Sequence, residues 1–252
     1  MMKSRRLLTS ALIVFVAALG VMLTQQGSAD AQRKEVGKVK YVRGDVSRAA
    51  KGSNEWAPVK KGVKLFEGDQ IRTLKRSRFE AALIDGSVLR LGSKTTLKLE
   101  GVLNQPKKKK RDIRAKLVAG KVWASVRKMA GTDTKFAVST SHAVAGVRGT
   151  RFQAAVDKDG TTVKVYSGSV LVSNEPIYKV KGHTKGNRVQ VAGPQEISKK
   201  QWNEIVAGAM QMIRVGSGGA MTKPQAFAKA DAGANEWEAW NSERDTNQGF
   251  HE

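Results

Sequence analysis

Glycine-containing turn signals recur along this chain at short, regular intervals, and they constrain the fold more than any other feature. Asp85-Gly86, Asp159-Gly160 and Ser167-Gly168 each separate two apolar runs. A two-residue β-turn requires a positive φ angle, which Gly adopts at little cost. Between the turns, apolar residues alternate with polar ones, as at Val163 and Val165. This alternation predicts an all-β fold, an antiparallel sandwich or roll of many short strands.

The β-domain is expected to extend from residue 36 to residue 195. The stretch NQPKKKKRD, residues 104–112, interrupts the alternation and has almost nothing to bury. It is therefore expected to form a basic loop.

One helix is expected, at residues 198–214. Ser198 to Gln201 fits a capping box, S-x-x-Q. Apolar side chains then recur with helical spacing, which indicates a helix packed on the core or, as the alternative, one that docks on a partner. These side chains are Trp202, Ile205, Val206, Ala209, Met212 and Ile213.

The last segment, residues 215–252, is rich in Gly and Ala and is expected to be a flexible tail. From Asn235 to Glu252 it holds five acidic residues against one Arg, together with Trp237 and Trp240. An acidic segment on a basic chain also suggests a second hypothesis. The tail would then fold back over the basic surface and compete with an external polyanion.

The first 31 residues have the pattern of a signal peptide. Three basic residues within the first six are followed by an uncharged apolar run, Leu7 to Leu23. Ala29-Asp30-Ala31 then fits the A-x-A cleavage pattern. An uncleaved N-terminal anchor is the alternative, which would hold the protein near a membrane. Both interpretations place the rest of the chain outside the cytoplasm, and a periplasmic location is predicted.

Composition limits the partners and the chemistry. The chain has 45 Lys and Arg against 22 Asp and Glu, a formal net charge of +23 over 252 residues, which attracts polyanions. It has no Cys, which excludes disulfides, thiolate nucleophiles and Cys-based metal sites. A zinc-binding His pair and a nucleophile elbow are also missing from the sequence. No catalytic residue, metal or cofactor is therefore predicted.

Positive charge is most concentrated between Lys107 and Lys128, where ten Lys or Arg stand against one acid. One interpretation is a solvated surface that aids solubility. The other is an electrostatic contact with an anionic envelope polymer, such as lipopolysaccharide or cell wall. Specific nucleic-acid recognition is not expected, because aromatic residues are not interleaved with the charges. The residues expected to contact a polyanion are Lys107, Lys108, Lys109, Lys110, Arg111 and Arg114.

An ordered set of motifs gives the chain a resemblance to the FecR domain family. GKVKYVRGDV, LIDGSVLRLGSKTTLKL, LVAGKVWASV, AVAGVRGTRF and YSGSVLV follow one another between Val36 and Ser173. The resemblance implies an extracytoplasmic β-domain used for binding or assembly, and it offers no catalytic residues. Members of the family are known as periplasmic sensor-regulators that carry a cytoplasmic anti-sigma region before a transmembrane helix. Only Met1–Arg6 precede the apolar run here, so the resemblance does not extend to sigma-factor regulation.

The stretch AVAGVRGTRF, Ala143 to Phe152, could be a phosphate-binding loop or a bent β-strand. A phosphate loop needs several glycines that lead into a helix N-terminus, whereas FQAAV follows here and has the pattern of a strand. The bent strand is therefore favoured, with Gly149, Thr150 and Phe152 in structural roles.

Within this strand, Val144, Val147 and Phe152 are expected to face the core. Arg148 and Arg151 are expected to reach solvent or to cap an edge of the sheet.

The sequence thus predicts a non-enzymatic, exported binding or scaffold protein of the cell envelope, which engages a protein partner or an anionic envelope polymer. One alternative is an envelope-tethered sensory or regulatory component of a signalling system. Another is a glycan-acting enzyme, which would need two facing carboxyl groups about 5 to 9.5 Å apart in a groove.

Overall fold

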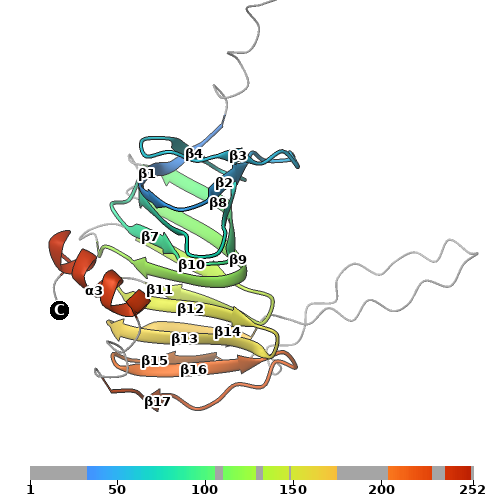
Figure 1. Cartoon of the computed structure of the whole chain (residues 1–252). Coiled ribbons are helices and arrows are strands. Elements are labelled where there is room, and N and C mark those ends of the chain that lie inside the picture. The colour runs from blue at the N-terminus through green and yellow to red at the C-terminus, as the bar shows by residue number, and fades with distance from the viewer. Residues whose placement is uncertain are drawn as a thin grey trace, which may run out of the picture. The chain divides into compact units, whose positions relative to one another are not determined.

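The computed structural model describes residues 33–105, 110–128, 133–147, 149–174, 204–228 and 236–250. Within these ranges the chain is mostly β-strand, with one helix near the C-terminus (Figure 1). The strands and the helix belong to one compact unit, Glu35–Glu252. The all-β prediction is confirmed. The predicted signal peptide lies outside the described residues, and none of the helical residues in the described ranges forms a segment long and apolar enough to span a membrane.

Backbone hydrogen bonds arrange the strands in two sheets that share one long strand, β9 (Lys110–Ser125). Before Gly120, β9 pairs with β8 (Thr95–Gln105) and β10 (Asp133–Ser139) in sheet B. From Gly120 onward it pairs with β7 (Val88–Leu91) and β12 (Arg151–Asp157) in sheet A. The β9–β10 pair is parallel, whereas the other strand pairs among the described residues are antiparallel.

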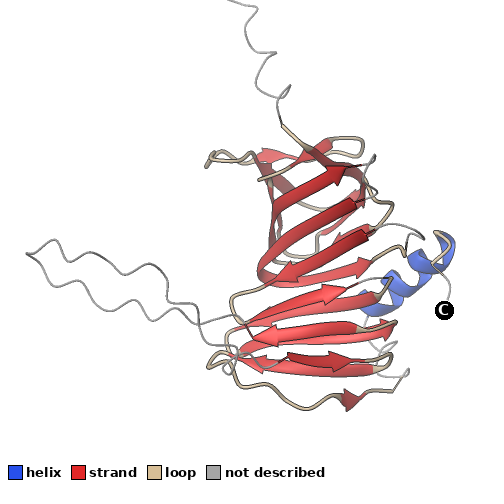
Figure 2. Ribbon diagram, turned by 180° about the vertical axis from the view of Figure 1, so that it is seen from behind, coloured by secondary structure: helices blue, strands red, loops and turns tan. Residues whose placement is uncertain are grey.

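Strand pairing gives the order of the remaining strands on either side of β9, and the strands follow one another as a ladder in Figure 2. Sheet A is ordered β4 (Lys64–Phe66), β1 (Glu35–Arg43), β6 (Arg78–Leu83), β7, β9, β12, β13 (Gly160–Ser167), β16 (Gln211–Gly216) and β17 (Gln225–Ala226). Sheet B is ordered β3 (Ala57–Pro58), β2 (Val46–Ala49), β5 (Gln70–Thr73), β8, β9, β10, β11 (Ala143–Val147), β14 (Val170–Asn174) and β15 (Glu204–Ala207).

The inner faces of both sheets form one hydrophobic core. Phe79 and Phe152 of sheet A are buried in it, and so are Leu97 and Ile113 of sheet B. Because side chains alternate between the two faces of a strand, every second residue enters this core and its neighbours face outward.

The chain crosses between the sheets at glycine corners. β11 of sheet B leads into β12 of sheet A through Gly149-Thr150, and β13 of sheet A leads into β14 of sheet B through Gly168-Ser169. Gly149 has a φ of 64° and Gly168 a φ of 83°. The Thr150 hydroxyl donates a hydrogen bond to the Ser169 carbonyl at 2.9 Å. The AVAGVRGTRF and YSGSVLV motifs therefore pack against each other at one corner.

The side chains of AVAGVRGTRF follow the alternation of β11 and β12. Ala143, Ala145 and Val147 are buried, whereas Val144 is half-exposed, so the expectation that Val144 faces the core is wrong. Phe152 is fully buried. Arg148 lies outside the described residues.

The predicted helix at residues 198–214 is wrong for its described part. Glu204–Ala207 form β15 and Gln211–Gly216 form β16, and residues 198–203 lie outside the described residues. Ile213 and Val215 are buried on one face of β16, and the apolar spacing suits this alternation as well as a helix. Met210 has a φ of 59°, a turn conformation that no α-helix accommodates.

The predicted flexible tail, residues 215–252, is also wrong for its described part. Val215 belongs to β16, β17 follows at Gln225–Ala226, and Glu236–Asn247 form α3. Large apolar residues are sparse in the tail, but polar and charged contacts help to order α3.

The predicted basic loop at residues 104–112 is largely strand. β8 extends to Gln105 and β9 begins at Lys110, and these two residues pair directly. Residues 106–109 lie outside the described residues. Cross-strand pairing therefore continues into a stretch whose composition favoured a loop.

The predicted end of the β-domain, at residue 195, lies within residues 175–203, which are not described. The β-structure continues beyond them in β15, β16 and β17.

We predict that Gly168→Ala destabilises the protein by roughly 1–3 kcal/mol, because a non-Gly residue is strained at positive φ. The added Cβ would also lie 2.8 Å from the Gly149 carbonyl oxygen. Gly218→Ala is the matched control, because nothing lies within 4 Å of the Cβ it would add. Chemical denaturation measures both free energies of unfolding. Equal values for the two variants would contradict the account of this corner.

Candidate functional site

The outer face of sheet A carries polar and charged side chains that are nevertheless buried. Glu80 on β6, Arg90 on β7, Trp123 and Ser125 on β9, and Gln153 on β12 are each less than a tenth exposed. They are buried because α3 lies across these strands (Figure 1). We call this arrangement, α3 together with the five side chains it covers, the helix clasp.

Arg90 is the centre of the helix clasp. Its Nε donates to Glu80 Oε2 at 2.7 Å, and its Nη1 donates to Asp245 Oδ1 at 2.6 Å. The side chains of Arg90 and Asp245 are both fully buried. One guanidinium thus links a carboxylate of the sheet directly to a carboxylate of the helix.

Asp245 accepts two further hydrogen bonds from the sheet. The Ser125 hydroxyl donates to Oδ1 at 2.7 Å, and the Trp123 indole Nε1 donates to Oδ2 at 2.9 Å. A buried carboxylate is stable only when it is paired and hydrogen-bonded, and these three donors meet that condition.

Glu80 binds a second arginine, from the helix. Arg244 donates from Nε to Oε2 at 2.7 Å and from Nη2 to Oε1 at 2.9 Å, a bidentate pair. Burial alone would raise the pKa of Glu80, but hydrogen bonds from Arg244 and Arg90, with their positive charges, outweigh it. The pKa of Glu80 therefore lies below its ordinary value of 4.5.

The N-terminal half of α3 is held by similar contacts. Trp237 Nε1 donates to Gln153 Oε1 at 2.9 Å, and Lys164 on β13 pairs with Glu238 at 3.1 Å. Burial, and secondarily the charge of Glu238, raises the pKa of Tyr166 beside it. The oxygen Oδ1 of Asn241 is buried and accepts no hydrogen bond from the described residues. The interface is therefore polar along its length and incompletely satisfied.

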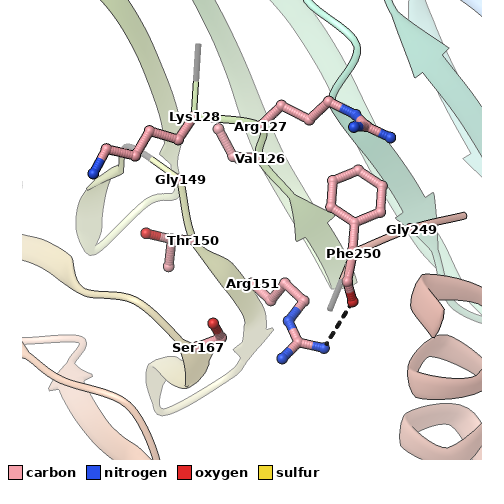
Figure 3. A pocket seen from close by; sticks show the side chains of 9 residues that line it. All are labelled: Val126, Arg127, Lys128, Gly149, Thr150, Arg151, Ser167, Gly249 and Phe250. Carbon is pink, nitrogen blue, oxygen red and sulfur yellow. Dashed lines mark hydrogen bonds between the residues drawn. The ribbon is translucent and has the colours of Figure 1, made fainter. Parts of the chain in front are cut away.

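A shallow, open pocket of about 230 Å³ lies at the C-terminal end of α3 (Figure 3). Arg151 Nη1 donates to the Phe250 carbonyl at 3.4 Å, and the Arg127 guanidinium lies 4.6 Å from the centre of the Phe250 ring. The segment after the helix thus closes one side of the pocket. The pocket is lined by Val126, Arg127, Lys128, Gly149, Thr150, Arg151, Ser167, Gly249 and Phe250, with no carboxylate side chain among them.

The residues that the sequence singled out lie in different parts of the structure. Gly149 and Thr150 line the pocket, whereas Arg151 points toward Phe250 rather than to a sheet edge (Figure 3). Arg114 is exposed on sheet B, and Lys110 and Arg111 begin β9. Lys107, Lys108 and Lys109 lie outside the described residues. The polyanion contact therefore stays a prediction.

Sequence reasoning missed the helix clasp. One signal was available, because Arg90 is the one charge in the apolar strand VLRL, and Glu80 lies between apolar neighbours in RFEAAL. A lone charge in such a run needs a partner of opposite charge. What the sequence did not show is that the partners come from a helix more than 150 positions away.

We predict that Asp245→Asn releases α3, because removing one member of a buried ion pair costs about 3–5 kcal/mol. Glu243→Gln is the control, since Glu243 is exposed on the same helix and loses the same charge. Limited proteolysis near residues 236–250, together with tryptophan fluorescence, measures the release. Equal protection of α3 in the two variants would show that the Arg90–Asp245 pair does not hold the helix.

Acid should also loosen the helix clasp. The pKa of Glu80 is lowered in the folded protein, so its stabilising contribution is complete above the ordinary value of 4.5 and is lost as the pH falls through the lower folded value. We expect the fluorescence of the clasp tryptophans to shift toward that of an exposed indole below about pH 4. A spectrum that stays unchanged until the whole protein unfolds would argue against this linkage.

Residues 69–171 match the family described as FecR protein. Two crystal structures of a protein from Parabacteroides distasonis ATCC 8503, described as a candidate anti-sigma factor and solved at 1.65 and 2.50 Å resolution, are similar in part. Each is 19% identical over 66% of this chain, with TM-scores of 0.45 and 0.44. The chain spans 65% and 64% of their lengths.

No curated protein matches the sequence. The family match begins later than the expected resemblance from Val36, but it includes the strands from β5 to β13 and the corner at Gly149 and Gly168. Residues 69–171 are thus similar to the FecR family, and this match covers less than half of the chain.

Proposed function

We propose that this protein is a sensory or regulatory component of a signalling system in the cell envelope, and that it works by exchanging α3 for a segment of a protein partner. The FecR match favours this regulatory function over the expected binding or scaffold role. A periplasmic location, an exported chain and the lack of an enzymatic activity are parts of this proposal.

One observation carries the proposal: α3 is attached mainly through polar and charged side chains, beside the aromatic contacts of Trp237 and Trp240. Four side chains of the helix are buried, and three of them are polar, namely Glu238, Asn241 and Asp245. A buried ion pair contributes little net stability, because desolvation offsets much of the attraction. A helix held in this way should open at a lower free energy than the apolar core.

The same contacts specify what a competing segment must present. It needs a carboxylate to reach Arg90 and a cation to reach Glu80, which Asp245 and Arg244 provide at adjacent positions of α3. It also needs an aromatic group near Tyr41, where Trp240 now lies with ring centres 5.6 Å apart. These requirements favour a polar, tryptophan-bearing helix of a protein partner over a small ligand.

Competition is favourable for regulation because α3 is linked covalently to the sheet it covers. Its effective concentration is high, so a partner binds well only when it is abundant or when α3 is already weakened. A signal that loosens α3 would therefore raise the apparent affinity for the partner.

We predict that Asp245→Asn changes the transcript levels of a defined set of genes in the source organism without any external signal, because it mimics partner-driven release of α3. The measurement is RNA sequencing of strains that express the native chain, Asp245→Asn or Glu243→Gln at equal protein levels. The Glu243→Gln strain should match the native one. Identical transcripts in all three strains, with proteolysis showing that α3 is released in Asp245→Asn, would refute the regulatory function.

A further inference from the structure

The outer face of sheet B carries an uncompensated row of cations at its centre. Along β9, Ile113, Ala115 and Leu117 enter the core, so Arg114 and Lys116 face outward. On β8, Leu97 and Leu99 enter the core, so Lys98 faces outward. Lys98 and Lys116 are direct cross-strand partners. Lys98, Arg114 and Lys116 thus form one cluster, which we call the sheet B basic row.

The arrangement costs stability. Like charges that are directly opposite in an antiparallel pair repel each other, and a carboxylate at either position would instead stabilise the pair. None of the three side chains forms an ion pair with a carboxylate of the described residues. Each buried acid of the helix clasp, by contrast, is paired with an arginine or lysine of sheet A or α3, namely Glu80, Glu238 and Asp245.

Local packing keeps the row flat and accessible. Gly101 lies opposite Arg114, and a Cβ there would be 2.9 Å from Arg114 Nη2. The missing side chain lets the guanidinium lie on the sheet. Lys110 and Asp112 share the outward parity of Arg114 on β9, so one carboxylate lies on this face next to the row. Adjacent strands are about 4.8 Å apart, so the row presents cations at short, repeated intervals.

We propose that the sheet B basic row binds a linear anionic polysaccharide, a chain that carries carboxylate or phosphate groups on successive sugars. Repeated cations on neighbouring strands match repeated anions along an extended polymer. The outward positions of the row carry no aromatic side chain on which nucleobases could stack, which disfavours single-stranded nucleic acid. The proposal concerns sheet B and does not depend on the exchange of α3.

The test uses the full chain and polygalacturonate as the probe, with dextran as the uncharged comparison. Lys98→Gln/Arg114→Gln/Lys116→Gln should weaken binding about 100-fold at low salt, given about fivefold per removed contact. The triple variant should also show a shallower salt dependence, because fewer counterions are released. Lys38→Gln/Lys40→Gln/Lys158→Gln is the control, since it removes three exposed cations outside sheet B. It should lose much less affinity.

A second variant separates binding from folding. Lys116→Glu places a carboxylate opposite Lys98, so it should raise the melting temperature or leave it unchanged while it weakens polygalacturonate binding about 25-fold, at about fivefold per unit of charge. Weaker binding together with equal or higher stability supports the proposal.

Three outcomes would overturn it. The first is an equal loss in the control variant, which would mean that net charge alone drives binding. The second is no binding of polygalacturonate by the native chain. The third is stronger binding of phosphatidylglycerol vesicles or duplex DNA at the same salt, lost in the triple variant, which would assign the row to that ligand.

Discussion

The structure depends on one strand, β9, which belongs to both sheets. It bends at Gly120, where φ is 83° and a Cβ would lie 2.6 Å from the Lys94 carbonyl oxygen. Before the bend its outward side chains are Arg114 and Lys116 on sheet B, and after the bend Trp123 and Ser125 lie on the outer face of sheet A. A single strand therefore supplies the two surfaces that carry the proposed functions, and alternation fixes which residues reach each one.

The two surfaces differ in the burial and pairing of their charged side chains. On sheet A, Arg90 and Glu80 are desolvated and neutralised together with the two buried acids of α3, Glu238 and Asp245, so the contact is specific but contributes little net free energy. On sheet B, the cations remain in contact with solvent and lack partners among the described residues, so they are free to attract an external anion. The described residues thus include a helix clasp whose buried charges are paired and a basic row whose charges are available.

Much of the fold could be predicted from the sequence, because turn glycines and period-2 alternation are local signals. Asp159-Gly160 and Ser167-Gly168 bound β13 as the pattern indicated. The helix was misplaced because Ile205, Met212 and Ile213 fit helical and strand spacing equally well, and only pairing with β13 and β14 decides between them. The order of α3 could not be predicted, since its polar residues are buried by partners far away in sequence. The sequence predicted a polyanion contact at Lys107–Arg111 and Arg114. The pairing of β8 with β9 instead places Lys98 and Lys116 beside Arg114 on one face, and such pairing between strands cannot be recognised from one stretch of sequence.

The central claim is that α3 is a separately releasable element held by buried charge. Native-state hydrogen exchange in low denaturant tests it most directly, because exchange free energies report local opening amide by amide. The account predicts that α3 amides exchange at a distinctly lower free energy than the amides of β9 and β12, with little dependence on denaturant. Exchange of α3 only through global unfolding, at the same free energy as β9 and β12, would contradict the claim.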